Sequence, residues 1–114
     1  MHEMSLAMQL IEIVTARAQA ADARAVSRVE VELGNLAGVM AEALEFCFAA
    51  AAKGSLAARA ELVIIPITAQ GHCRQCAARF PVAGLPADCP ACGKWDVEIQ
   101  GGQELRLAAI HIED

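Results

Sequence analysis

The sequence is poor in basic and aromatic residues, which argues against a nucleic-acid-binding protein. Its 114 residues include nine Lys and Arg against fourteen Asp and Glu, with one Trp and no Tyr. The formal net charge is −5, and the segment 68–99 carries three basic and three acidic residues. Proteins that bind nucleic acids neutralise phosphates with clustered Lys and Arg. We therefore expect no nucleic-acid partner.

Long hydrophobic runs and an export signal are also missing. No apolar stretch approaches the roughly 20 residues that a membrane-spanning helix needs. The start, Met1-His2-Glu3, does not open a basic segment of the kind that begins a secretory signal peptide. Five cysteines, four of them in metal-binding spacing, suit a reducing compartment. These features predict a cytoplasmic protein without a membrane partner.

Catalytic motifs are absent as well. The three histidines stand at positions 2, 72 and 111, and none has the helix-spaced partner of an H-E-x-x-H site. No Ser/His/Asp arrangement and no phosphate-binding loop is evident. We therefore expect that the protein has no catalytic residues and is not an enzyme.

Four cysteines form two tight pairs that are typical of a metal site. Cys73 and Cys76 make one C-x2-C pair, Cys89 and Cys92 make the other, and twelve residues separate them. Two such pairs supply the four thiolates of a tetrahedral, structural zinc site with no position left open for substrate. A redox dithiol, two disulfides and an iron site of the rubredoxin type are the alternatives. The fifth cysteine, Cys47, is expected to be a buried small hydrophobic residue.

Hydrophobic periodicity predicts two helices, 4–22 and 39–53, and strands at 28–33, 61–67 and 103–112. The strand 61–67 is expected to be buried on both faces, with Pro66 at a sheet edge or strand exit. In the last strand, the alternation of apolar and other residues changes phase near Ala108-Ala109, which predicts a β-bulge if one face stays buried. Ile13 and Met40 are expected on the buried faces of the two helices.

The resulting fold class is α+β. Residues 1–67 and 100–114 are expected to form a small mixed sheet of about three strands with two helices. Residues 68–99 are expected to form a four-cysteine zinc-ribbon domain, inserted between the last two strands. The metal ion would stand in for the apolar core that this short segment lacks.

The N-terminus is a second candidate metal site. Met1-His2-Glu3 places an α-amine, a backbone amide, an imidazole and a carboxylate within three residues. The amine, the deprotonated amide and the imidazole can lie in one plane around Ni(II) or Cu(II). A surface histidine without a metal is the alternative interpretation.

Several segments resemble one family along the whole chain. The opening Met1-His2-Glu3-Met4-Ser5-Leu6 is similar to the MHE-x-S-L start of the HypA/HybF family of hydrogenase nickel-insertion accessory proteins. Segments 31–34, 43–48 and 102–107 resemble the family's first strand, second helix and closing strand, and the two cysteine pairs match its zinc knuckles. These motifs in this order are far more specific than a four-cysteine unit alone.

The resemblance implies a metallochaperone in place of an enzyme. Family members bind nickel at the N-terminal His and pass it to the large subunit of a [NiFe]-hydrogenase, together with a HypB-type GTPase. The nickel ligands carried over to this sequence are His2, the amine and backbone of Met1, and Glu3. Zinc would be structural, and nickel would be a transient cargo. Some relatives add a carboxylate just before the second helix, where this chain has Met40.

A zinc-ribbon adaptor is the alternative function. Such a protein would dock other proteins through its ribbon, with an inert N-terminus, and the loop from Leu85 to Cys89 and Trp95 would supply the contact. A free sheet edge could also pair between chains, so a monomer and a homodimer both stay open.

Overall fold

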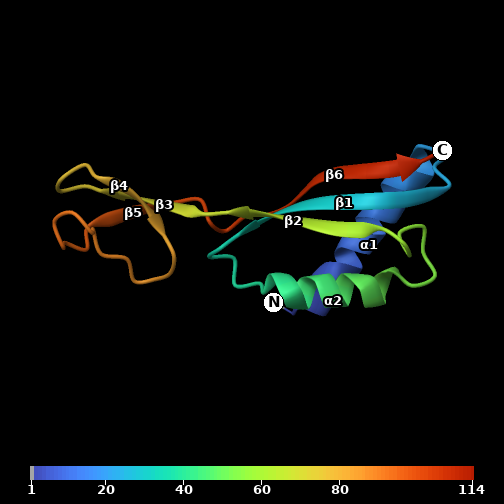
Figure 1. The fold of residues 1–114 in the computed structure, drawn as a ribbon, viewed down its shortest axis with the longest axis horizontal. Coiled ribbons are helices and arrows are strands. Elements are labelled where there is room, and N and C mark those ends of the chain that lie inside the picture. Colours follow the sequence, from blue (N-terminus) through green and yellow to red (C-terminus); the bar gives the residue numbers. More distant parts are fainter. Residues whose placement is uncertain (1) are drawn as a thin grey trace.

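The computed structural model describes residues 2–114, which form an elongated molecule of 55 × 23 × 16 Å. Figure 1 shows a helix-covered sheet at one end and a smaller sheet at the other. No helix of the described residues is both long enough and apolar enough to cross a membrane. The elements are α1 (Glu3–Ala20), β1 (Ala25–Gly34), α2 (Ala41–Ala52), β2 (Glu61–Ile67), β3 (Ala69–Cys73), β4 (Arg79–Val82), β5 (Val97–Gln100) and β6 (Leu105–Glu113).

The strands form two sheets of three. The first sheet has the order β2-β1-β6, with β1 parallel to β2 and antiparallel to β6. The second sheet has the order β4-β3-β5 and is antiparallel. The strands of the second sheet lie between β2 and β6 in the chain, so the four-cysteine unit is an insertion. The α+β class and the mixed sheet with two helices are confirmed; the domain limits at 67/68 and 99/100 stay a prediction.

The two helices cover one face of the first sheet and build the main core there (Figure 1). Two bulges keep the apolar residues on that face. One falls at Ser27, so that Val26 and Val29 are both fully buried despite their odd spacing. The other leaves Ala108 without a partner between the pairs Glu30–Ala109 and Val31–Leu107, which confirms the bulge expected near Ala108-Ala109.

Three predictions of burial were wrong. The strand β2 has no fully buried residue, because it is an edge strand with helices on one face alone; Pro66 lies at this edge, as expected. Ile13 is 43% exposed at the margin of the buried stripe of α1. Met40 is 69% exposed because it is the N-cap of α2 and precedes its buried stripe. Cys47, which was expected to be buried, packs against the core but is only half-buried.

A close approach between the ends of β1 and β6 joins the two sheets, and no local sequence pattern predicts it. A Cβ atom at Gly34 would collide with the Gly102 backbone, which itself has φ +89°. The Asn35 side chain donates from Nδ2 to the Val82 carbonyl at 2.7 Å and accepts from the Ala69 amide at 2.9 Å. Asn35 therefore fastens β3 and β4 to the end of β1.

Candidate metal centres

The first candidate centre is the four-cysteine cluster in the second sheet unit. The Sγ atoms of Cys73, Cys76, Cys89 and Cys92 all lie within 4.8 Å of one another. The pairs Cys73–Cys92 and Cys76–Cys89 are 3.7 and 3.6 Å apart. Tetrahedral Zn–S bonds of about 2.3 Å place sulfurs about 3.8 Å apart, so these residues fit a zinc ion. The same separations are far too long for disulfide bonds.

The two cysteine pairs use the same backbone turn to aim their sulfurs inward. In the first turn, the Ala77 amide donates to the Cys73 carbonyl at 2.9 Å, and Ala77 has φ +65°. In the second turn, the Gly93 amide donates to the Cys89 carbonyl at 2.8 Å, and Gly93 has φ +75°. The first cysteine of each pair is buried and the second is exposed.

The Asp96 carboxylate connects the segment after the second cysteine turn to the first turn by hydrogen bonds. Asp96 accepts hydrogen bonds from Gln75 Nε2 at 2.9 Å and from Arg74 Nη1 at 3.0 Å. These contacts, first the Gln75 amide and then the Arg74 guanidinium, hold the pKa of Asp96 below its ordinary value. The carboxylate therefore stays ionised and links the segment after Cys92 to the first turn.

The surroundings of the sulfurs favour thiolate at some positions and thiol at others. The Cys76 amide, which donates to the Cys73 sulfur, is the main reason that the pKa of Cys73 is lowered to about 7. The Cys92 amide likewise lowers the pKa of Cys89. The Ala78 amide also acts to lower the pKa of Cys76, but the hydrogen bond with the Cys89 thiol, partial desolvation and the other two thiols outweigh it and raise that pKa to about 11. A metal ion must therefore displace protons to bind all four.

Zinc binding should consequently release protons and weaken as the pH falls. At neutral pH Cys76 holds its proton and Cys73 is about half ionised, so we expect net release of at least about one proton per zinc ion. Calorimetry in buffers of different ionisation enthalpy measures this number. Competition with a chelator across acidic and neutral pH measures the loss of affinity. An affinity independent of pH would contradict thiolate coordination at these residues.

The second candidate centre lies at the start of α1. His2 is exposed and is the N-cap of this helix, whose Leu6 amide donates to the His2 carbonyl at 3.2 Å. The His2 side chain forms no cap hydrogen bond to the helix. The imidazole therefore stays available to a ligand. Met1 lies outside the described residues.

Glu3 connects this helix start to the second helix. Its Oε2 accepts a hydrogen bond from the Met40 amide at 3.3 Å, and Met40 is the N-cap of α2. The Glu3 backbone amide and then the Met40 amide hold the pKa of Glu3 below its ordinary value. An ionised carboxylate thus stands next to His2, as a cation site requires. Glu42 is exposed in the first turn of α2.

The other candidate residues lie apart from both centres. His72 is half-buried on β3, and His111 is exposed with its Nε2 2.7 Å from Glu30 Oε2. Within residues 2–114, the four cysteines form the one group of three or more His, Cys, Asp or Glu side chains that lie close enough together to hold a metal ion. Trp95 and Leu85 are 83% and 63% exposed on the unit that holds it.

The fold and these centres define a metal-handling protein with a closed four-thiolate unit on one side and an open N-terminal histidine on the other. A family model described as hydrogenase/urease nickel incorporation, metallochaperone, hypA, matches residues 1–112. The chain belongs to the HypA family. This is a family of metallochaperones and not of enzymes, which agrees with the missing catalytic motifs.

Similar proteins support this assignment over the full length. The hydrogenase maturation factor HypA of Chlorobium phaeobacteroides (strain BS1) is 46% identical over 113 residues, 99% of this chain and 100% of that protein. Its counterpart in Geobacter sulfurreducens is 41% identical with the same coverage. The solution structure of the Ni metallochaperone HypA from Helicobacter pylori has a TM-score of 0.66 at 26% identity, covering 99% of this chain and 98% of that one.

Proposed function

We propose that this chain binds Ni(II) at its N-terminus and delivers it to the large subunit of a [NiFe]-hydrogenase. The ligands are His2, the amine and backbone of Met1, and the Glu3 carboxylate. The observation that carries the proposal is the position of His2: exposed, uncapped and next to an ionised carboxylate. Membership of a nickel metallochaperone family supports it. The partners proposed are that large subunit and a HypB-type GTPase, in the cytoplasm.

The two centres divide the work by their donor atoms. Four thiolates hold a zinc ion, which supplies structural cross-linking and no chemistry toward nickel. Nitrogen and oxygen donors at the N-terminus suit Ni(II), and an incomplete, exposed site can release its ion. Cys73 and Cys89 are buried in their unit, while His2 is exposed at the start of α1. This difference limits loading of the wrong ion.

A second candidate function is a zinc-ribbon adaptor without nickel transfer of its own. The exposure of Trp95 and Leu85 favours a contact surface on that unit. Nickel titration separates the two functions, because an adaptor needs no N-terminal metal.

Blocking the α-amine tests the proposed nickel site directly. A short extension before Met1 converts the amine to an amide and removes one nitrogen donor. We expect nickel affinity to fall at least about tenfold, while zinc content and folding stay unchanged. The same extension placed after Asp114 is the matched control, and intact-mass analysis establishes that Met1 is retained. Equal nickel binding by both extended chains would contradict the proposed ligand set.

A further inference from the structure

The methionines of the chain are concentrated at one corner of the molecule. The sequence has four, at positions 1, 4, 8 and 40, and the three that the structure describes are all exposed. Met40 is 69% exposed, Met8 60% and Met4 39%. Both helices begin at this corner, where the Glu3–Met40 hydrogen bond joins their starts (Figure 1). Thioether sulfurs are therefore accessible to solutes beside the proposed nickel site.

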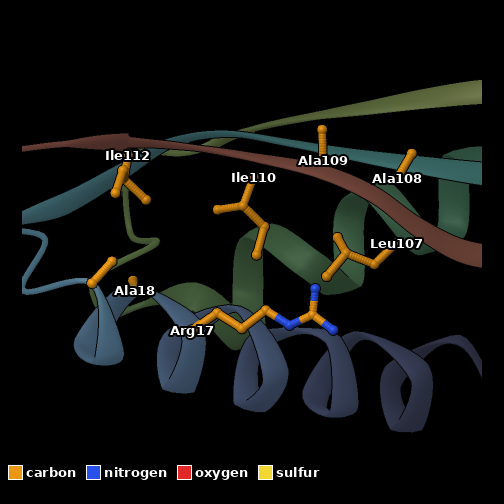
Figure 2. A pocket seen from close by; sticks show the side chains of 8 residues that line it. Arg17, Ala18, Leu107, Ala108, Ala109, Ile110 and Ile112 are labelled. Atoms are coloured by element: carbon orange, nitrogen blue, oxygen red, sulfur yellow. The ribbon is translucent and has the colours of Figure 1, made fainter.

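Packing does not account for the two methionines of α1. The buried stripe of this helix includes Leu6 and Leu10 but neither Met4 nor Met8. The apolar groove between α1 and β6, about 300 Å³ in volume, does not involve them either, since Arg17 lines it (Figure 2). At about 3.6 residues per turn, Met4 and Met8 fall on the opposite side of the helix from Arg17.

Met40 is joined to the N-terminal site through its own backbone. It is the N-cap of α2, and its amide donates to Glu3 Oε2 at 3.3 Å. Its side chain makes no cap hydrogen bond to α2. A methionine side chain is unbranched and flexible, so the sulfur is free to turn toward Glu3 and its neighbour His2. A change in the chemistry of this sulfur is therefore felt at the proposed site.

Oxidation changes the donor type that Met40 offers to a metal ion. A thioether is a soft ligand, whereas carboxylate and carbonyl oxygens are hard ones. A hydroperoxide transfers an oxygen atom to the sulfur: the S–O bond forms, the O–O bond breaks, and water or an alcohol leaves. The sulfur is oxidised to the sulfoxide as the peroxide is reduced, and a methionine sulfoxide reductase restores the thioether.

We propose that Met40 is a site of reversible oxidation, and that its sulfoxide oxygen completes the N-terminal nickel site. This role rests on the proposed function, because it requires nickel at His2 and Glu3. The thioether form leaves the site exposed and short of donors, which suits release of the ion. The sulfoxide form adds a polar oxygen beside the Glu3 carboxylate. Oxidation therefore makes the chain retain its nickel and slows delivery.

Peptide mass spectrometry of untagged, zinc-loaded protein treated with hydrogen peroxide measures the modification. We expect Met40 and Met8 to gain oxygen before Met4, in the order of their exposure, while the zinc content stays near one ion per chain. A methionine sulfoxide reductase should remove the added oxygen. A Met40 that stays reduced after Met4 is oxidised would overturn the proposal, and so would loss of zinc before Met40 reacts.

Nickel titration of the same samples measures the consequence. We expect the oxidised protein to bind Ni(II) about fivefold more tightly than the reduced protein, which is the contribution of a single polar contact. Met40→Leu keeps an apolar side chain that peroxide does not oxidise, and it should abolish the gain. Met40→Gln carries a permanent side-chain oxygen and should show the gain without peroxide. Met8→Leu is the matched control and should behave as the wild type.

The outcomes separate this proposal from the proposed function. Nickel binding that depends on His2 but does not change on oxidation would overturn the role of Met40 and leave the nickel site intact. Nickel binding that His2→Ala leaves unchanged would overturn both. A gain that persists in Met40→Leu, or that disappears in Met8→Leu, would also contradict the assignment to Met40.

Discussion

Replacing His2 by Ala is expected to remove stoichiometric nickel binding while the zinc content stays near one ion per chain. His2 supplies the one imidazole of the proposed site and is exposed at the start of α1. Loss of a partner that merely orients a metal ligand typically costs 10–100-fold in affinity. Loss of the ligand itself should therefore cost at least about 100-fold. Isothermal titration of untagged, zinc-loaded protein with Ni(II) measures the change.

The matched control is His111→Ala. His111 is also exposed, but it lies on β6, where its Nε2 is 2.7 Å from Glu30 Oε2. Its loss should leave nickel binding unchanged. His72→Ala provides a second control beside the cysteines, since His72 lies directly before Cys73. Nickel binding that survives in His2→Ala, or that disappears in His111→Ala, would place the site elsewhere.

Replacing Cys73 by Ser is expected to abolish zinc retention and to unfold the second sheet while the first sheet persists. Cys73 is fully buried at the end of β3, the central strand of that sheet. Few apolar side chains are buried around it, chiefly Ala69 and Val82. The metal ion therefore replaces a core, and losing one of four ligands leaves little to order the unit.

Two-dimensional amide NMR measures the loss of the second sheet and the persistence of the first sheet separately. Resonances of residues 69–100 should collapse to unfolded shifts, and those of β1 and α1 should keep their positions. Cys47→Ser is the matched control, because Cys47 packs against the main core and lies outside the cluster. Zinc retained in Cys73→Ser, or lost in Cys47→Ser, would contradict the assignment of the four-thiolate site.

Periodicity and spacing predicted much of this molecule. The bulge near Ala108 followed from a change of phase in a single strand, since one face must stay buried. The closeness of the four sulfurs followed from the C-x2-C spacing, because each pair closes one local turn. The short motifs along the chain resemble one family, and the match of residues 1–112 to the HypA family model agrees with that resemblance.

Features that depend on distant parts of the chain were harder to predict. Helix periodicity placed Met40 in a buried stripe, but the helix begins after it, and its amide meets Glu3 from another helix. The Asn35 side chain forms hydrogen bonds to Ala69 and Val82, which lie 34 and 47 positions further along the chain. The sequence contains no local signal for these contacts. Ile13 lies at the margin of the buried stripe of α1, and helix periodicity does not show where tertiary packing stops covering the helix.

X-ray absorption at the nickel edge of the untagged, zinc-loaded chain tests the central claim most directly. The proposed site predicts nitrogen and oxygen ligands, including an imidazole that disappears in His2→Ala, and no sulfur. Zinc should remain bound to four sulfurs in the same sample. Nickel surrounded by thiolates, with zinc displaced from Cys73, Cys76, Cys89 and Cys92, would contradict the separation of cargo and structural metal.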